Sequence, residues 1–378
     1  MEFLALAAVI LGVVVLQNWL FQHKALENLE YRCYLNKDQV FEGEEIELVE
    51  ELANKKWLPV PWLKTEITTS RWLEFAGAQS TVSGQSRFVP SFFLMKSYQK
   101  VTRRWKVRCL KRGEFEIEKV ILVSTDLFGN RSLSRPEQVN ARVLVLPRPL
   151  SDEGLTVAPK HQNGDIQVRR QLLDDPFMIS GVREYTERDP MNKIHWSATA
   201  KEGRIMVYNN DYTSQQSVTV ILNLQSREFE HFETMDQDRM EDAIRVCARL
   251  FDDTLATGMP LRFMVNGNVD EARKTVVTSE YWGAEYVESL LQVLAKLRLT
   301  ATEDFSRYLN MNYRDITSTD LVIVTLYLND AITSFARSKD ADGVHTRIIL
   351  LGAPKEDTDI TGCDLVCLRD LKGGEQDA

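Results

Sequence analysis

The alternation of apolar and polar positions divides the chain into regions. Between residues 29 and 147, apolar residues recur mostly at every second position, which is the pattern of half-buried β-strands. Segments 29–35, 45–52, 62–69, 103–109, 115–124 and 142–147 show it, with turn-like sequences such as Glu42-Gly43 between them. Short strands without a helix between them predict an antiparallel β-sandwich over 29–147, in which Trp57, Trp62 and Trp72 lie in or near the core.

A different pattern begins at residue 216. Continuous apolar runs at 217–224, 261–267, 320–328, 346–352 and 364–368 are typical of strands buried on both faces. Segment 238–255 has its apolar residues on one helical face and is followed by Gly258, which suits a helix C-terminus. Val287, Leu290, Leu291, Leu294 and Leu297 mark a second helix. Strands alternating with helices predict an open, mostly parallel α/β sheet over 216–372.

The chain begins with an apolar stretch, Phe3 to Phe21, that contains no charged residue. As a helix it would be about 28 Å long, close to the hydrocarbon thickness of a bilayer. The alternative, a cleaved signal peptide, would have a basic start and small residues at a cleavage site. The sequence therefore predicts an uncleaved transmembrane anchor over 1–24. Lys24, Arg32 and Lys37 follow it, which predicts a single-pass protein with its main body in the cytoplasm.

The fold class predicted from these patterns is an N-terminal transmembrane helix, then an antiparallel β-sandwich, then an α/β domain. The stretch between the last two, 148–215, lacks a clear period and is interpreted as a linker that carries a polar motif.

Composition narrows the possible partners. Lys and Arg number 46 against 55 Asp and Glu, and the resulting net charge of −9 argues against nucleic acid, whose phosphates need clustered cations. The 5 cysteines are scattered, which favours a reducing compartment over a disulfide framework. Cys363 and Cys367 are interpreted as buried thiols, with metal binding as the alternative.

Sequence signatures of catalysis are missing. We find no phosphate-binding glycine loop, no dinucleotide fingerprint, no Gly-x-Ser-x-Gly elbow and no histidine pair at zinc-ligand spacing. We therefore expect a protein that is not an enzyme, without a catalytic residue, cofactor or metal.

The end of the first apolar run of the α/β region raises one alternative. Von Willebrand factor A domains place a metal-binding Asp-x-Ser-x-Ser motif at this point. Asn223, Gln225 and Arg227 occupy the three motif positions here, so the carboxylate is missing and a cation replaces a ligand hydroxyl. The residues predict a von Willebrand factor A-like fold with a degenerate metal site. A metal-dependent adhesion module is the alternative.

The motif at 181–207 concentrates polar and aromatic groups: Arg183, Glu184, Tyr185, Asp189, His195 and Trp196. Three interpretations remain open. The leading one is a structural lock between two domains, with Arg183 and Trp196 buried. The second is a surface for a protein partner, and the third is a hydrolase site that uses Asp189 and His195.

Four segments together resemble the domain-of-unknown-function family 58. They are LKRGEFEI at 110–117, STDLFGN at 124–130, VLVLPRPL at 143–150 and SGVREYTERDPMNKIHWSATAKEGRIMV at 180–207. The chain departs from the family pattern at Leu127, at Arg188 and at Asn192-Lys193.

The resemblance implies a bacterial, membrane-anchored protein with a β-domain and a von Willebrand factor A-like domain. Such proteins are commonly associated with MoxR-type AAA+ ATPases, and often with a transglutaminase-like membrane protein. The function that we expect is therefore non-enzymatic interaction or chaperone-like assembly at the cell membrane, with a MoxR-type ATPase as partner.

Overall fold

The computed structural model describes residues 24–125, 132–150, 174–186, 194–212, 216–230, 232–269, 275–353 and 361–368, with positions 12, 15, 19 and 191. The chain divides into two compact units. The first contains Met1–Leu150, Val269–Glu271 and Glu285–Arg298, and the second contains Ser151–Asn268, Ala272–Ala284 and Leu299–Ala378.

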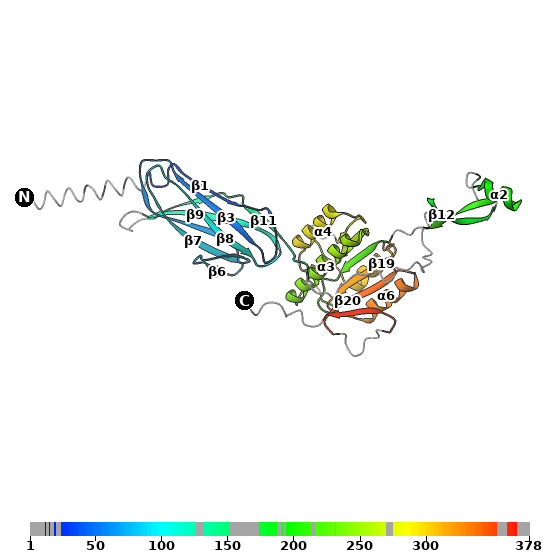
Figure 1. Ribbon diagram of the computed structural model, residues 1–378. Coiled ribbons are helices and arrows are strands. Elements are labelled where there is room, and N and C mark those ends of the chain that lie inside the picture. The colour runs from blue at the N-terminus through cyan, green and yellow to red at the C-terminus, as the bar shows by residue number, and fades with distance from the viewer. Residues whose placement is uncertain are drawn as a thin grey trace, which may run out of the picture. The chain divides into compact units, whose positions relative to one another are not determined.

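Two β-sheets build most of the first unit (Figure 1). The four-stranded sheet has the order β1 (Leu29–Leu35), β3 (Glu45–Asn54), β8 (Lys100–Cys109), β5 (Leu73–Phe75). The other has the order β2 (Gln39–Phe41), β11 (Arg142–Leu146), β9 (Gly113–Thr125), β4 (Val60–Ser70), β7 (Ser86–Met95), β6 (Thr81–Ser83). Strand β10 (Ser132–Glu137) also pairs with β9. All pairings are antiparallel except that of β2 with β11.

The alternating pattern of the sequence produces the core of this unit. On β4, Leu63, Thr65, Ile67 and Thr69 are buried, and the residues between them are not. Apolar residues of both sheets meet in one cluster, which includes Ile46, Leu48, Ile67, Val107, Val120 and Val143. The β-sandwich predicted from the sequence is confirmed.

A carboxylate lies inside this apolar interior. Glu50 of β3 is fully buried, and its oxygens accept four hydrogen bonds from neutral groups. The donors are Tyr31 Oη at 2.9 Å, Thr65 Oγ1 at 3.0 Å, Ser91 Oγ at 3.2 Å and Trp105 Nε1 at 2.7 Å. A buried charge is tolerated only when it is well hydrogen-bonded, and these four donors supply that here.

Helix α4 (Ala284–Lys296) is held in the first unit by Arg112, a residue of the LKRGEFEI segment. The buried guanidinium donates from Nη1 to the carbonyl oxygens of Leu294 at 2.6 Å, Ala295 at 3.2 Å and Leu297 at 3.1 Å. The last carbonyls of a helix have no partner within the helix and carry partial negative charge. Arg112 therefore stabilises the C-terminal end of α4.

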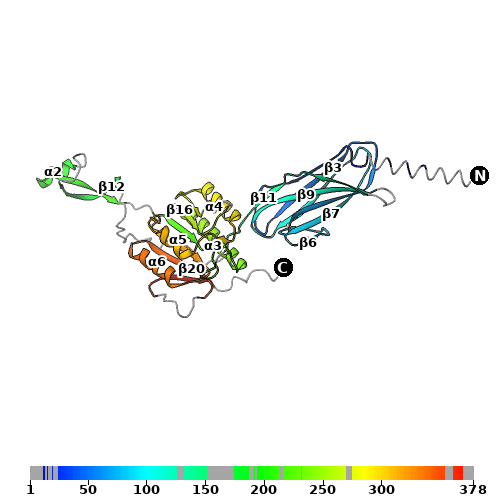
Figure 2. The ribbon, with the colours of Figure 1, turned by 180° about the vertical axis from the view of Figure 1, so that it is seen from behind.

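A six-stranded sheet forms the centre of the second unit (Figure 1, Figure 2). Its order is β17 (Val276–Val277), β16 (Leu261–Val265), β14 (Val218–Leu222), β19 (Asp320–Thr325), β20 (His345–Leu351), β21 (Asp364–Leu368). All neighbours are parallel except β16 and β17. Strands β15 (Phe232–Glu233) and β18 (Thr300–Ala301) form a separate pair.

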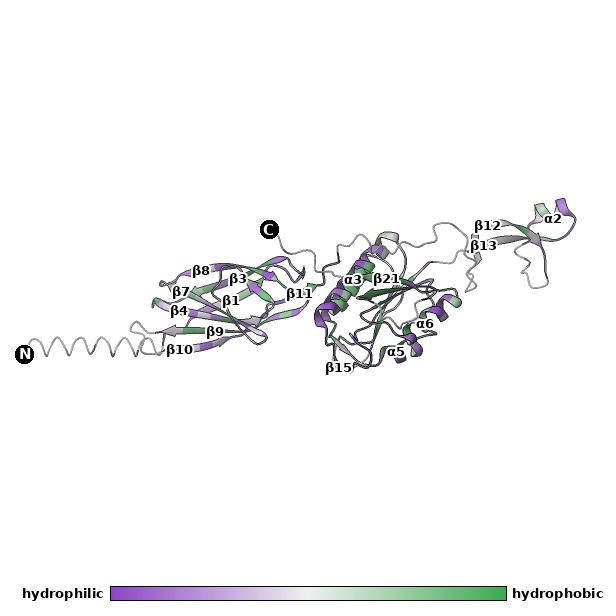
Figure 3. Ribbon diagram, turned by 90° about the horizontal axis from the view of Figure 1, so that it is seen from below, coloured by the Kyte–Doolittle hydropathy of each residue, from purple (hydrophilic) through white to green (hydrophobic). Residues whose placement is uncertain are grey.

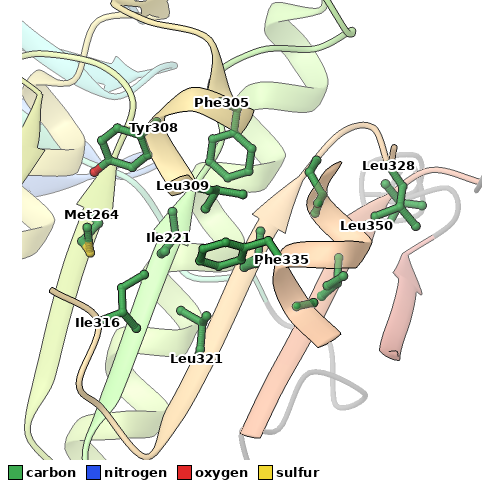
Figure 4. Packing of buried hydrophobic residues seen from close by; sticks show 14 of the residues in the cluster. Ile221, Met264, Phe305, Tyr308, Leu309, Ile316, Leu321, Leu328, Phe335 and Leu350 are labelled. Atoms are coloured by element: carbon green, nitrogen blue, oxygen red, sulfur yellow. The ribbon is translucent and has the colours of Figure 1, made fainter. Parts of the chain in front are cut away.

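Helices cover both faces of this sheet. Helix α3 (Gln237–Thr257) packs through Phe251 against Phe263 of β16, with ring centroids 5.3 Å apart. Helices α5 (Phe305–Met311) and α6 (Asp330–Ala341) contribute Phe305, Leu309 and Phe335 to a cluster with Ile221 and Met264 (Figure 4). Because Phe263 and Met264 are neighbours on one strand, they point to opposite faces. The layers are therefore α/β/α.

Within the stretch expected to be a linker, the structure forms a hairpin. Strand β12 (Asp174–Glu184) pairs antiparallel with β13 (Met206–Tyr212), and the short helix α2 (Trp196–Glu202) lies between them in sequence. The mixed apolar and polar residues here did not reveal these strands. The motif at 181–207 is thus carried by secondary structure of its own.

The fold class predicted from the sequence is wrong for the chain as a whole. Among the residues that the structure describes, strand (43%) outweighs helix (23%), and no helix there is long and apolar enough to cross a membrane. The 21-residue helix α3 has both hydrophilic and hydrophobic positions, which Figure 3 shows in purple and green. Apart from positions 12, 15, 19 and 24, the expected anchor at 1–24 lies outside the described residues.

Candidate functional site

The carboxyl ends of the parallel strands bring together several polar side chains. Asn223 directly follows β14, Asn266 directly follows β16, and Thr325 ends β19. Parallel strands end at the same edge of a sheet, which is where α/β proteins commonly place their sites. Asn223 donates from Nδ2 to Thr325 Oγ1 at 3.0 Å, and Asn266 Nδ2 lies 3.4 Å from Asn223 Oδ1.

Gln225 extends this network toward α5. Its Oε1 accepts from the backbone N–H of Phe305 at 2.8 Å and from Tyr327 Oη at 3.3 Å. Its Nε2 donates to the carbonyl oxygen of Glu230 at 2.7 Å, and its own N–H donates to Asn223 Oδ1 at 3.0 Å. Burial raises the pKa of Tyr327 to about 12, so this phenol keeps its proton at neutral pH.

These contacts correct the comparison with a metal-binding motif. The side-chain oxygens of Asn223 and Gln225 accept hydrogen bonds from N–H and O–H groups, which point their protons at the place a cation would need. Arg227 is exposed. Across the described ranges, no group of three or more His, Cys, Asp or Glu side chains could hold a metal ion. The edge is a neutral, buried amide and hydroxyl network, and the von Willebrand factor A-like assignment is not retained.

Glu230 closes the loop that follows this network. Its carboxylate accepts from Ser226 Oγ at 2.8 Å and from the backbone N–H groups of Ser226 and Met235, the latter at 2.7 Å. The loop between β14 and α3 is therefore tied to itself. Asn266 was missed in the sequence because a single polar residue after an apolar run is indistinguishable from an ordinary turn residue. Glu230 was missed because it lies in a loop segment that is rich in polar residues.

The second candidate is the hairpin. Glu184 ends β12 and forms an exposed ion pair with Arg204, with Oε2 and Nη1 3.4 Å apart. Tyr185 donates its backbone N–H to the carbonyl oxygen of Ile205 at 2.9 Å. The backbone of Arg183 pairs with Val207, and the Arg183 side chain lies outside the described residues, as does Asp189.

His195 has a local role at the start of α2. Its Nδ1 accepts the backbone N–H of Ala198 at 3.2 Å and lies 2.9 Å from Ser197 Oγ. The backbone N–H of His195 donates to the carbonyl oxygen of Met206 at 2.8 Å. An N-cap satisfies donors that the first helical turn leaves unpaired, so the imidazole fixes how α2 leaves the hairpin.

The side chain of Trp196 lies at the surface of the hairpin, where it is 71% exposed. A lock between two domains, which would bury this indole, stays a prediction from the sequence. Three more apolar side chains of residues 182–205 are also exposed, namely Val182, Met191 and Ile205. We call these four residues the hairpin surface. Several large apolar side chains that are exposed within one short segment are a common feature of protein interaction sites.

Comparisons with known proteins give no family for the chain. No protein-family model matches it, and no curated protein does. Similar solved structures include a non-cellulosomal cohesin from Archaeoglobus fulgidus, with 12% identity, a TM-score of 0.21, and coverage of 31% of this chain and 91% of that one. A Coh-OlpA cohesin from Clostridium thermocellum has 10% identity and a TM-score of 0.22, and covers 32% of this chain and 100% of that one.

Domains D2 and D3 of the pilin SpaD from Corynebacterium diphtheriae have 11% identity and a TM-score of 0.22, covering 33% of this chain and 57% of that one. At such scores these likenesses carry no argument about function, and the resemblance to the domain-of-unknown-function family 58 stays a prediction from sequence motifs.

Proposed function

We propose that the chain is a non-enzymatic interaction or assembly protein whose hairpin surface binds a MoxR-type AAA+ ATPase. The observation that carries the proposal is the exposure of Trp196 at the start of α2. Exposed tryptophans are frequent energetic centres of protein interfaces, because they bury a large area when a partner covers them.

The hairpin holds its shape through contacts that leave the surface free. The β12–β13 ladder, the His195 cap and the bond from Met206 N–H to Thr199 Oγ1 at 2.9 Å are all internal to it. Ile194 and Val207 form its buried interior. The side chain of Trp196 has no part in these hydrogen bonds, which suits a residue selected for binding rather than for folding.

The choice of partner comes from the sequence resemblance, which also implies a transglutaminase-like membrane protein in the same assembly. The membrane location and the cytoplasmic placement of the main body rest on the sequence of residues 3–21. This stretch lies almost entirely outside the described residues, so both stay predictions.

Crosslinking in cells, followed by capture of the full-length chain, tests the proposal. The wild type should recover a MoxR-type ATPase, and Trp196→Ser together with Met191→Ser should recover much less. Trp282→Ser is the matched control, since Trp282 is also exposed but lies outside the hairpin. Absence of the ATPase from the wild-type sample, or equal recovery with all variants, would contradict the proposal.

A further inference from the structure

Five large apolar side chains are exposed at one end of the β-sandwich. They are Trp57, Trp62, Phe92, Leu94 and Tyr98, and their exposed fractions lie between 60% and 72%. We call them the aromatic end. Trp57 and Trp62 were expected in or near the core, and the structure places both outside it.

The register of β4 and β7 explains why three of these side chains are neighbours. Leu63 pairs with Phe93 and Lys64 pairs with Phe92, and a bulge between Val60 and Leu63 holds Trp62 beside Leu94. Leu63 and Phe93 point into the core. Adjacent residues point the other way, so Trp62, Phe92 and Leu94 share the outer face of the sheet.

Two loops bring the other two residues to the same end. The loop after β3 and the loop after β7 are joined by the bond from Tyr98 N–H to the Lys56 carbonyl oxygen, 3.1 Å long. Asn54 Nδ2 bridges the carbonyl oxygens of Leu58 at 3.0 Å and Lys96 at 2.9 Å. Ser97 Oγ donates to the carbonyl oxygen of Trp57. Trp57 and Tyr98 are therefore fixed on adjoining loops.

The N-terminal segment enters the sandwich at this end. Lys56 Nζ donates to the carbonyl oxygens of Ala25 and Glu27, each at 2.7 Å. The backbone N–H of Lys55 donates to the carbonyl oxygen of Asn28 at 3.0 Å. The chain that precedes residue 24 includes the uncharged stretch from Phe3 to Phe21. The aromatic end thus lies where the most apolar part of the sequence meets the folded unit.

We propose that the aromatic end lies in the interfacial region of a lipid bilayer. Tryptophan and tyrosine favour this region because each combines an apolar ring with a polar group, while Phe92 and Leu94 add purely apolar area. The exposed Lys96, on the same loop as Tyr98, can approach anionic headgroups. The point at which the uncharged stretch joins the unit favours lipid over a protein partner as the occupant.

Depth-dependent fluorescence quenching tests this proposal with the full-length chain in vesicles of phosphatidylcholine and phosphatidylglycerol. Some of the lipids carry bromine on the acyl chain near the headgroup, which quenches nearby indoles. The protein has 7 tryptophans, so pairs of Trp→Phe variants are compared. The Trp57→Phe/Trp62→Phe variant should lose a clearly larger share of the lipid-dependent quenching than the Trp196→Phe/Trp282→Phe variant.

Phenylalanine preserves the apolar surface, so the first variant reports position without removing the docking itself. Equal losses in the two variants would overturn the proposal. Absence of lipid quenching at Trp57 and Trp62 would also overturn it. If the aromatic end then retained another protein, it would be a protein docking surface. Capture of the ATPase by the hairpin surface is a separate measurement, so either proposal can fail alone.

Discussion

The indole nitrogen of Trp105 lies 2.7 Å from Oε2 of Glu50 in the β-sandwich. The four groups that donate hydrogen bonds to this carboxylate, including the indole, are all uncharged. Glu50→Leu would leave the indole N–H and three hydroxyl groups without their acceptor, at roughly 1–3 kcal/mol for a buried unsatisfied donor. We expect a loss of several kcal/mol in unfolding free energy, measured by urea denaturation.

Glu50→Gln should be much milder. A side-chain amide can turn its oxygen toward Trp105, and the hydroxyls of Tyr31 and Thr65 can accept from its nitrogen. Glu74→Gln, on the exposed side of β5, is the control. Equal stability of the Leu and Gln variants at position 50 would refute this account of the network.

Arg112→Ala should destabilise the first unit. Three carbonyl groups at the end of α4 would lose a charged donor, and hydrogen bonds to charged groups contribute about 1.5–3 kcal/mol. Arg112→Lys should recover part of the loss. Arg142→Ala removes an exposed arginine of the same unit and should have little effect in the same denaturation experiment.

Asn223→Asp should weaken the second unit and should not create a metal site. Aspartate cannot donate to Thr325 Oγ1, and burial of its charge is unfavourable by a few kcal/mol. Millimolar Mg²⁺ should leave the melting temperature unchanged in both wild type and variant, because only a ligand that binds the native state raises it. A metal-dependent increase in either protein would revive the adhesion alternative. Asn310→Asp, an exposed position, is the control.

Substitution of the neighbouring residues His195 and Trp196 should affect the stability of the hairpin to different extents. His195→Ala removes the N-cap of α2 and should destabilise the hairpin by about 1 kcal/mol. Trp196→Ala removes an exposed side chain and should change stability by less than about 0.5 kcal/mol. Hydrogen exchange of the β12–β13 amides would measure both, and strong loss of protection in Trp196→Ala would support the lock hypothesis instead of a binding surface.

Lys56 should make stability depend on alkaline pH. Burial lowers the pKa of Lys56 from 10.5 to about 8, and the positive charge of Arg135 adds to this. Between pH 8 and 10.5 the unfolded chain then holds more protons at this lysine than the folded chain, so stability rises with pH across that window. Denaturation at several pH values between 8 and 10.5 should show the unfolding free energy of the wild type rising relative to that of Lys56→Met as pH increases. A difference that stays constant across this range would contradict the lowered pKa.

Strands with a regular alternation were predictable. Residues 29–35 alternate, lie between turn sequences and form β1 over that same range. Helix α6 was missed because Ile332, Phe335 and Ala336 are almost its whole buried apolar face, which is too little for a clear period. The strands of the hairpin were missed for a similar reason, since neither β12 nor β13 has a sustained alternation.

The sequence indicated which residues belong to the candidate sites, but it did not indicate whether their side chains are buried or exposed. The sequence located Asn223 and Gln225 at the end of a predicted strand, and His195 and Trp196 in a polar motif within a predicted linker. It did not show that Asn223 and Gln225 are buried among hydrogen bonds while Trp196 is exposed. Burial depends on which segments pack together, and a residue such as Glu50 breaks the apolar pattern on the very face that becomes the core.

The parallel pairing of β2 with β11 has a consequence for biosynthesis. Val40 is made early, yet its partner Val145 leaves the ribosome only after the rest of the sandwich, and Glu285–Arg298 of the same unit follows much later. Antiparallel pairs that are close in sequence, such as β1 and β3, can form while the chain is growing, but the pairing of β2 must wait for β11. A nascent chain therefore exposes an incomplete sandwich for much of its synthesis, and this interval is when a chaperone would be of most use to it.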